Sequence, residues 1–314
     1  MIMSNLNKFN HPKEVNNTMF TENLTNFLDS FFGISSFEPD IPFSSVIPKI
    51  YKQHWINYKE LFEPNYLSSF HGLMIKNSSI IKKAFLTVFM DGTVLQKILD
   101  TKIEDAIIIA HHPVEDETCG KWFLPISKYF LNQLKSKRIS LYVLHSPLDN
   151  NVIISTTHSL LKLFNIKAIS PVGEYHGHPV WMIWDFSSEI DFADLILQLP
   201  ELFDISHINY IKKAEKIRRI AIVPWWGTDI DLILSAQKKW ADLYLTGDYY
   251  NKLKLPHGEM ERSKFSSIVD SLTMSLIECS HYATEKIVME KELLDLIKLQ
   301  GIDAEFINQD NPWY

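Results

Sequence analysis

Residues 106–110 form a short aliphatic run, rich in isoleucine, that stops at His111, His112 and Pro113. Such a run predicts a strand buried on both faces, as in a parallel sheet that is covered by helices. Proline cannot continue the hydrogen-bond ladder, so we expect the strand to end at the two histidines. Ligands collect at the carboxyl ends of strands in α/β sheets, which makes this end a candidate site. A pair of hydrogen-bonded loop histidines would give the same short motif.

Two stretches of the chain, 85–112 and 220–248, share one pattern. In each, an apolar run leads to a Gly-Thr pair, an Ile-Leu pair follows after four residues, and an aspartate precedes a second apolar run. Each stretch therefore predicts a strand, a glycine turn, a helix and a second, parallel strand. Any two units of this kind look alike, but we interpret these two as a duplication. The strand ends near residues 112 and 248 would then be counterparts that face one shared cleft.

Helical and extended patterns alternate along the rest of the chain, which is typical of the α/β class. Apolar residues at helical spacing predict helices over 122–135, 152–164, 189–197, 263–274 and 283–299. Short apolar runs predict strands over 139–144, 180–186 and 276–279. We expect a disordered tail at 1–20, a first α/β half at 21–150 with an aromatic-rich insertion near 53–68, and a second α/β half at 151–314.

Composition limits the classes of partner. The net charge is −7, which gives no strong nucleic-acid signal, although a local basic pocket remains compatible with it. Cys119 and Cys279 are too few for a disulfide framework or a zinc-thiolate site, and they fit a reducing compartment. No apolar run approaches the roughly twenty residues of a membrane span. We therefore expect a cytoplasmic protein without membrane contact.

Three predicted strand ends carry side chains of the metal-binding type: His111 with His112, His145 with Asp149, and His281 with Glu285. Consecutive side chains of a strand point in opposite directions, so two adjacent histidines suit two ions better than one. Residues four apart share a helix face, so a histidine and a glutamate at this spacing can act together. Nitrogen and oxygen ligands without sulfur suit Zn²⁺, Mn²⁺, Fe²⁺ or Co²⁺ and disfavour Ca²⁺. One histidine, at 145, could support a ligand rather than bind a metal.

The fold that these observations predict is α/β, with two similar α/β halves related by pseudo-twofold symmetry and a metal site in the cleft between them. At this point the chain resembles a known family. The resemblance to the GTP cyclohydrolase 1 type 2 family, also called the NGG-interacting-factor-three-like family of dinuclear-metal proteins, rests on His111-His112-Pro113, His145-x-x-Leu148-Asp149, Thr246-Gly247-Asp248 and His281-Tyr282-Ala283-Thr284-Glu285. The ending Phe306-Ile307-x-x-x-Asn311-Pro312 also resembles that family.

The resemblance implies two divalent metal ions, Zn²⁺, Mn²⁺ or Fe²⁺. His112 and Asp149 would hold one ion, His111 and His281 the other, and Glu285 would bridge both. The resemblance also implies a ring-shaped homohexamer, built as a trimer of dimers, whose sites face an internal cavity. These assignments come from the family and not from the spacing of the residues.

The family name implies conversion of GTP to a dihydroneopterin triphosphate by attack on the purine ring and hydrolysis of the formyl intermediate. A two-metal site could equally cleave an amide or a phosphoester. Asp248 stands where the family has glutamate, and with Glu285 it is a candidate catalytic group, as general base or substrate contact. The turn at 224–227 and the stretch at 71–75 also depart from the family pattern. We therefore do not restrict the expected substrate to GTP and expect a nucleotide or a related small molecule.

Two hypotheses follow. The first is a metal-dependent hydrolase, with GTP cyclohydrolase-like ring opening as the candidate reaction. The alternative is a non-catalytic, oligomeric metal-binding scaffold or protein-interaction partner. The aromatic-rich stretch at 53–68 motivates the alternative, because exposed aromatic side chains mark interfaces.

Overall fold

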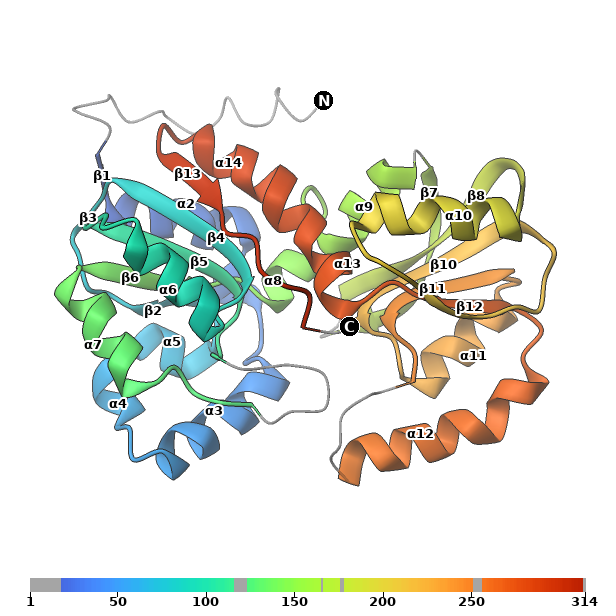
Figure 1. The fold of residues 1–314 in the computed structure, drawn as a ribbon, viewed down its shortest axis with the longest axis horizontal. Helices are drawn as coiled ribbons and strands as arrows, with labels where there is room; N and C mark the ends of the chain where they lie inside the picture. The colour runs from blue at the N-terminus through green and yellow to red at the C-terminus, as the bar shows by residue number, and fades with distance from the viewer. Residues whose placement is uncertain (1–17, 116–122, 165, 176–177, 251–255, 313–314) are drawn as a thin grey trace. The chain divides into compact units, whose positions relative to one another are not determined.

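The computed structural model describes residues 18–115, 123–164, 166–175, 178–250 and 256–312 (Figure 1). By its internal contacts the chain forms two compact units. The described residues of the first unit are 18–115, 123–154 and 289–309, and the rest belong to the second unit. Nothing in the sequence indicates that 289–309 return to the first unit. The predicted domain limit at residue 150 stays a prediction.

The first unit contains most of the short helices. Its helices are α2 (Thr21–Phe32), the 3-10 turn η1 (Ile34–Ser36), α3 (Ile41–Gln53), α4 (Tyr58–Leu61), α5 (Pro64–Ser69), α6 (Gly92–Asp100), α7 (Lys128–Ser136), α8 (Ser146–Asp149), the π-helical turn η3 (Met289–Leu293) and α14 (Leu294–Lys298). Its strands are β1 (Met19–Phe20), β2 (Gly72–Ile75), β3 (Ile80–Ile81), β4 (Lys83–Phe89), β5 (Ala106–His112), β6 (Ile139–Val143) and β13 (Asp303–Phe306).

The main sheet of the first unit has the order β13-β4-β5-β6-β2. The neighbours from β13 to β6 are parallel, and β2 runs antiparallel to β6 at the edge. Every residue of β5 is buried, as expected for an inner strand of a parallel sheet that helices cover. Phe85, Ile108 and Leu141 of the three central strands lie in one apolar core with side chains of α3, α6 and α7.

The second unit has the elements α9 (Thr156–Phe164), β7 (Lys167–Tyr175), β8 (His178–Asp191), α10 (Phe192–Phe203), β9 (Asn209–Ile211), β10 (Lys216–Trp226), α11 (Ile230–Lys238), β11 (Leu243–Asp248), α12 (Pro256–Ile268), the 3-10 turn η2 (Val269–Ser271), β12 (Ser275–Glu278) and α13 (His281–Val288). Its sheet has the order β7-β8-β10-β11-β12-β9. Among these described strands, the neighbours β10-β11 and β11-β12 are parallel, and the other neighbouring pairs are antiparallel.

The two segments that share the Gly-Thr pattern fold alike. One is β4-α6-β5 and the other is β10-α11-β11, and in each case the two strands are parallel neighbours. His112 pairs in register with Phe89, and Asp248 pairs with Trp226. These pairings make the ends of β5 and β11 counterparts. The prediction of two α/β halves built on this unit is confirmed, whereas their placement around a shared cleft stays a prediction.

Several predicted element limits differ from the observed ones. The helix predicted from residue 122 begins at Lys128, because the Ser127 hydroxyl accepts a hydrogen bond from the amide of Phe130 and caps the helix there. The helix predicted from 152 begins at Thr156, and the one predicted from 189 begins only after β8 ends at Asp191. The long helix predicted over 283–299 is interrupted by the π-helical turn η3.

The ends of the predicted insertion and tail also have structure. Residues 1–17 of the predicted tail lie outside the described residues. At the end of the predicted tail, β1 pairs with β3. In the aromatic-rich stretch, Phe62 and Tyr66 are buried, and their rings lie 5.5 Å apart. Phe62 also packs on Tyr51, with 5.0 Å between ring centroids. Trp55 is exposed. Phe62 and Tyr66 therefore pack in the core, whereas Trp55 lies on the surface.

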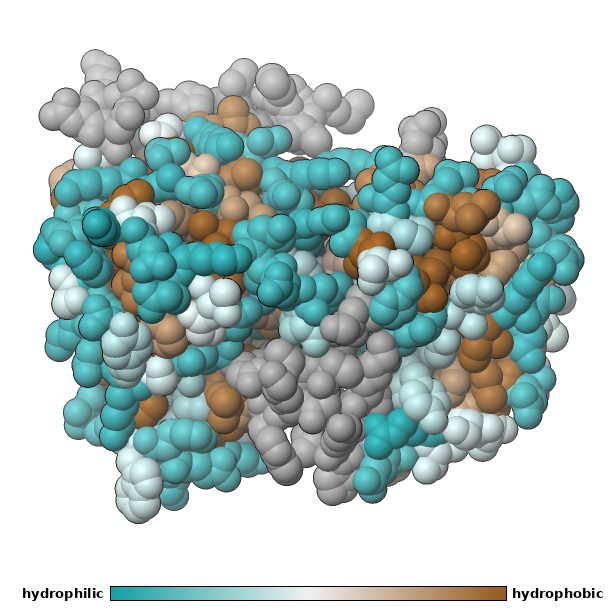
Figure 2. All heavy atoms as spheres, in the orientation of Figure 1, coloured by the Kyte–Doolittle hydropathy of each residue, from teal (hydrophilic) through white to brown (hydrophobic). Residues whose placement is uncertain are grey.

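The surface carries few large apolar side chains. Figure 2 shows apolar residues gathered over α10, where Leu197 is 78% exposed. Within the described ranges, none of the helices has the length and apolar composition that a bilayer-spanning segment needs.

Candidate metal centre

The end of β5 places two buried histidines in the first unit. His111 and His112 are the last residues of the strand, and both rings are almost completely inaccessible to solvent. The ring of His112 lies 4.5 Å from that of Phe89 and 5.7 Å from that of Phe43, between centroids. Two apolar rings therefore fix its orientation, and their presence keeps the surroundings of the imidazole dry.

A backbone hydrogen bond fixes the tautomer that a neutral His111 takes. Its Nδ1 lies 2.7 Å from the carbonyl oxygen of Leu144. A carbonyl can only accept, so Nδ1 donates, and in the neutral ring Nε2 carries the lone pair that a metal ion requires. This Nε2 is 3.7 Å from Oδ1 of Asp149. The hydrogen bond thus directs the potential ligand atom toward a buried carboxylate.

His145 completes a group of three histidines. It lies just before α8, and one ring nitrogen of each of His111, His112 and His145 lies within 4.8 Å of the others. Three imidazoles that converge in this way are a common ligand set for zinc and related ions. The sequence offered His145 either as a metal ligand or as a supporting residue, and the structure brings it into the same group as His111 and His112.

Asp40 holds His145 from a distant part of the chain. Its Oδ2 accepts hydrogen bonds from Nδ1 of His145 and from the hydroxyl of Ser146, both at 2.7 Å. Its Oδ1 accepts from the amide of Phe43 and so caps α3. Burial opposes ionisation of Asp40, but the histidine and this amide hold the pKa of its carboxyl below the usual range. Burial lowers the pKa of His145, and the charge of Asp40 opposes this effect only in part.

Asp149 comes from the short helix that follows His145. Pro147 lies in the first turn of α8, where its missing amide hydrogen costs nothing, and Leu148 is fully buried. These two residues fix the turn and leave the Asp149 side chain, itself buried, beside His111. The short helix α8 therefore sets the spacing of His145 and Asp149.

The second unit supplies a histidine and a glutamate from one face of α13. Nε2 of His281 lies 2.8 Å from Oε1 of Glu285, and both side chains are buried. The helix begins after Ser280, whose φ is +70° and whose hydroxyl donates to Oδ1 of Asn311 at 2.8 Å. The (i, i+4) spacing predicted this pair correctly.

The end of β11 presses against the start of α13. A Cβ on Gly247 would lie 2.6 Å from the carbonyl oxygen of Trp225 and 2.7 Å from Cα of His281. The hydroxyl of Thr284 accepts a hydrogen bond from the amide of Trp225. Thr246 accepts one from the amide of Gly227. Glycine is required at 247 because backbone occupies the space of a side chain, and this close approach positions His281.

Asp248 lies at the end of β11 and is fully buried. Its Oδ1 accepts a hydrogen bond from the amide of Tyr250 at 2.9 Å. One carboxylate oxygen therefore shapes the turn after the strand. The predicted role of Asp248 as general base or substrate contact stays a prediction.

A sequence model of the family described as Duf34/NIF3 (NGG1p interacting factor 3) matches residues 57–312. The chain belongs to this family. Two archaeal relatives, each named GTP cyclohydrolase 1 type 2 homolog, are similar to it. The relative from Pyrococcus horikoshii is 29% identical over 221 residues, which cover 69% of this chain and 81% of the relative. The relative from Pyrococcus abyssi is 30% identical over 184 residues, or 58% and 66% of the two chains.

Solved structures share the Duf34/NIF3 fold with this chain. TTHA1606 from Thermus thermophilus is 19% identical with a TM-score of 0.63, and the match covers 93% of this chain and 99% of that one. Reduced HcgD from Methanocaldococcus jannaschii is 17% identical with a TM-score of 0.59, covering 93% and 99%. At these identities the likeness concerns the fold alone. It confirms the predicted α/β class.

The predicted ligands of this Duf34/NIF3 protein thus fall into two sets. The structure brings His111, His112 and Asp149 together in the first unit, and His281 with Glu285 in the second. Sequence reasoning missed Asp40. The only local signal was an aspartate with a proline two positions later, which predicts a helix cap and says nothing of a contact with a histidine 105 positions later.

Proposed function

We propose that this Duf34/NIF3 protein is a metal-dependent hydrolase of a nucleotide or related small molecule, with GTP cyclohydrolase-like ring opening as the candidate reaction. The observation that carries the proposal is the buried group of His111, His112 and His145 at the carboxyl ends of β5 and β6, beside the carboxylate of Asp149. Burying three imidazoles and a carboxylate close together is unfavourable, because these polar groups lose their contact with water. A bound metal ion would offset this cost.

The donor atoms fit divalent transition metals. Neutral imidazole and carboxylate suit Zn²⁺, Mn²⁺ or Fe²⁺, and the Leu144 carbonyl already orients His111 as a ligand. We propose His112 and Asp149 as ligands of one ion, His111 and His281 as ligands of a second, and Glu285 as the bridge. Family membership supports the sharing of ions between the two sets.

Bound metal ions would lower the pKa of a water and stabilise negative charge that develops on the substrate. The residues of this chain would supply the rest. Asp248, buried at the end of β11, would accept a proton from the attacking water or hold the substrate. Phe43 and Phe89 would exclude bulk water from His112, which strengthens every electrostatic interaction there.

Metal content per chain, measured by elemental mass spectrometry, is the first test. We expect two ions in the wild type and a sharp loss in Glu285→Ala and in Asp149→Ala. Asp295→Ala is the matched control, because this carboxylate is exposed on α14 and should leave the metal content unchanged. Loss of only one ion in each variant would support two sets that bind independently. No uptake of Zn²⁺, Mn²⁺ or Fe²⁺ by the wild type would overturn the proposal.

Turnover is the second test. With the metal content verified, the wild type should hydrolyse GTP or another member of a nucleotide and phosphoester panel. Loss of a ligand should lower kcat/KM by more than about 100-fold, since loss of groups that only orient a ligand already costs about 10–100-fold. Turnover that is equal in Glu285→Ala and the wild type would contradict the assignment. A fully loaded protein that is inert on the whole panel would favour the scaffold hypothesis.

The assembly and the compartment belong to the same proposal. We propose a homohexamer in the cytoplasm, on the basis of family membership and of the small number of cysteines. Analytical ultracentrifugation of the metal-loaded protein measures the oligomeric state, and a monomer at all concentrations would contradict the homohexamer. The scaffold alternative stays open, because Phe62 and Tyr66 of the stretch 53–68 are buried whereas Trp55 is exposed.

A further inference from the structure

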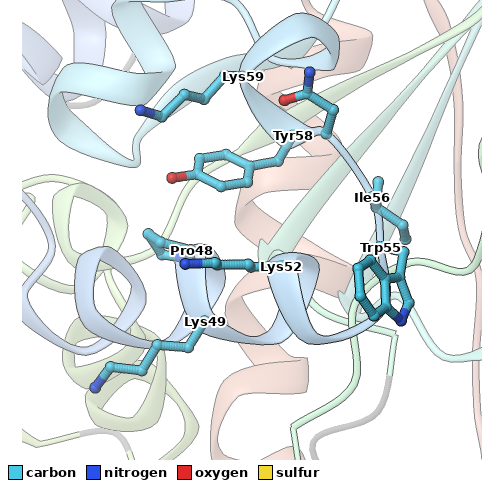
Figure 3. A pocket seen from close by; sticks show the side chains of 8 residues that line it. Pro48, Lys49, Lys52, Trp55, Ile56, Tyr58 and Lys59 are labelled. Carbon is cyan, nitrogen blue, oxygen red and sulfur yellow. The ribbon is translucent and has the colours of Figure 1, made fainter.

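A pocket of about 690 Å³ lies on the first unit, lined by α3, by the turn that follows it and by α4 (Figure 3). Its lining includes Lys49, Lys52 and Lys59 together with Trp55 and Tyr58. None of these residues is a predicted metal ligand. Three of them, including Trp55, precede the stretch that matches the family, so the pocket is not a feature that the match describes.

The lysines give the pocket a positive charge that the whole chain, with a net charge of −7, does not have. Lys49 and Lys52 near the end of α3 would be ordinary by themselves, because cations stabilise the carboxyl end of a helix dipole. Lys59 comes from a different helix, so the dipole of α3 does not explain why it also lines the pocket. Within the described part of the chain, none of the three forms an ion pair.

Figure 3 shows the ammonium groups of Lys49, Lys52 and Lys59 on the same side of the view as the hydroxyl of Tyr58. Trp55 lies at the opposite end of the pocket. The lining is therefore polarised. One end offers cations and a hydroxyl, and the other offers an aromatic surface.

The turn after α3 fixes the backbone of Trp55. The indole is 86% exposed, while its neighbour Ile56 is buried. The amide of Trp55 donates to the carbonyl of Lys52 at 3.1 Å, and the amide of Ile56 donates to that of Tyr51 at 3.0 Å. These two bonds form a Schellman motif with Trp55, at φ +56°, in the place that glycine usually takes. The turn thus places an exposed indole beside the pocket.

Tyr58 forms a fixed wall of the same pocket. Its ring centroid lies 6.2 Å from that of Tyr51 and 5.9 Å from that of Phe62, and both of these rings are buried. The pocket therefore has an aromatic wall that needs no rearrangement before a ligand binds, which reduces the entropic cost of binding.

We propose that this pocket binds a nucleoside triphosphate, with the base against Trp55 and Tyr58 and the phosphates on Lys49, Lys52 and Lys59. Every base has a π-face that stacks on aromatic side chains, and ammonium groups bind phosphate oxygens. The volume lies in the range of about 300–1,000 Å³ that is usual for small-molecule sites. Three lysines on an acidic protein suit a short anion better than a nucleic acid, which needs a long basic surface. The site goes beyond the proposed function and requires no metal.

Photolabelling locates the ligand. Metal-free, full-length protein is irradiated with 8-azido-ATP and digested with trypsin. Cleavage after Lys52 and Lys59 releases residues 53–59, which contain both Trp55 and Tyr58. We expect the label on this peptide and its loss when ATP competes. The control is Trp240→Ala, because Trp240 has an indole that is 81% exposed at the same kind of helix end. Trp240→Ala should label the peptide 53–59 as strongly as the wild type, and Trp55→Ala should not. Label that stays on this peptide in Trp55→Ala, or that ATP does not displace, would overturn the proposal.

Calorimetry with ATP measures the binding affinity, and variants show how much the indole and the lysines contribute to it. Trp55→Ala should weaken binding about tenfold, as expected for the loss of one stacking surface. The triple variant Lys49→Gln, Lys52→Gln, Lys59→Gln should weaken it at least as much and make it insensitive to salt. Trp240→Ala is the matched control and should change nothing. Circular dichroism checks that each variant is folded, and exposed positions make this the expected result.

Three further outcomes bear on the assignment. Unchanged ATP binding in Glu285→Ala would support a site separate from the metal ligands, whereas its loss there would overturn it. Inorganic triphosphate that binds as tightly as ATP would overturn the role of the aromatic residues. A single-stranded oligonucleotide that binds tighter than ATP and depends on Trp55 would overturn the small ligand in favour of a nucleic acid.

Discussion

The two units build the same frame of parallel strands and finish it with different side chains. In the first unit β5 ends in His111 and His112, and in the second β11 ends in Gly247 and Asp248. Register pairs each last residue with an aromatic residue of the preceding strand, Phe89 or Trp226. The frame therefore fixes where side chains are presented, and the residues at its edge decide what they can bind.

The residue before the last shows why the two ends differ. In the first unit this position is His111, whose Nδ1 donates to the carbonyl of Leu144. In the second it is Gly247, because the backbone of His281 and the carbonyl of Trp225 take the place of a side chain. The first unit carries His111 and His112 on strand β5, whereas the second unit carries His281 on helix α13. The comparison teaches that a repeated fold can supply ligands from different elements.

The largest expected effects come from replacing the last residues of β5 and β11, which are His112 and Asp248. His112→Ala should lose both metal and turnover. Asp248→Asn should keep the metal and lower kcat by about 10²–10⁴-fold, because it removes a proton acceptor. The amide oxygen that replaces the carboxylate can still accept the hydrogen bond from Tyr250, so the turn should survive. Metal content and kcat, measured on the same samples, separate the two roles. Metal loss in Asp248→Asn would make Asp248 a ligand.

The next largest effect concerns stability. Replacing the glycines of the two Gly-Thr pairs, Gly92 and Gly227, should have different effects on the unfolding free energy. A Cβ on Gly227 would lie 2.8 Å from the Tyr244 hydroxyl and from Cβ of Thr246, so Gly227→Ala should cost about 1–3 kcal/mol of unfolding free energy. A Cβ on Gly92 would meet only the flexible ends of side chains, at 3.3 Å from Phe130 or more. Gly92→Ala should change the unfolding free energy by less than about 0.5 kcal/mol. Urea denaturation measures both, and equal losses would contradict the comparison.

The aspartates that precede β5 and β11 should differ in their response to pH. The hydrogen bond from Arg138, with help from Lys82 and Ser78, holds the pKa of Asp105 well below its usual range although burial opposes this. A depressed pKa stabilises the fold above the unfolded value of about 3.9 and loses this effect as the pH falls through the folded value. Both cations are half exposed, so the effect should be about 1 kcal/mol.

Urea denaturation at about pH 6 and about pH 3 tests this. Asp105→Asn should lower the unfolding free energy at the higher pH and flatten its decline toward the lower one. Asp242→Asn is the matched control from the second unit. Its carboxylate accepts from the amides of Arg218 and Arg219, and an asparagine oxygen can still do so. A decline that is as steep in Asp105→Asn as in the wild type would remove Asp105 as its cause.

The smallest effect concerns the serines that begin the two ligand-bearing helices. Ser146 donates to Asp40 in the first unit, and Ser280 donates to Asn311 in the second. Asn311→Ala removes one neutral hydrogen bond and should cost about 0.5–1.5 kcal/mol. Hydrogen exchange should show faster opening at the start of α13, with α8 unchanged as the control. No change at α13 would mean that Asn311 does not anchor this helix.

Local patterns predicted those parts of the site that lie within one element. The aliphatic run of β5 with its terminal His111 and His112, and the pair of His281 and Glu285 on one helix face, both follow from the periodicity of a single stretch. Helix limits were less predictable. The apolar spacing extends beyond the helices, and caps such as Ser127 decide where the backbone bonds begin.

Contacts between distant residues left no comparable signal. Burial of Phe62 and Tyr66 could not be read from their aromatic composition, which suits an interface and a core equally well. The pocket beside Trp55 likewise depends on how α3 and α4 pack, because its lysines come from both helices.

The sequence by itself determined the α/β class, the repeated strand-helix-strand unit and the identity of the donor residues at the strand ends. Burial imposes a period on each element, and that period is visible in a window of about ten residues. Only the tertiary structure decided that Leu144 sets the tautomer of His111 and that Asp40 holds His145. The residues of these pairs lie 33 and 105 positions apart, and nothing in a local pattern depends on which distant residue fills a buried hydrogen bond.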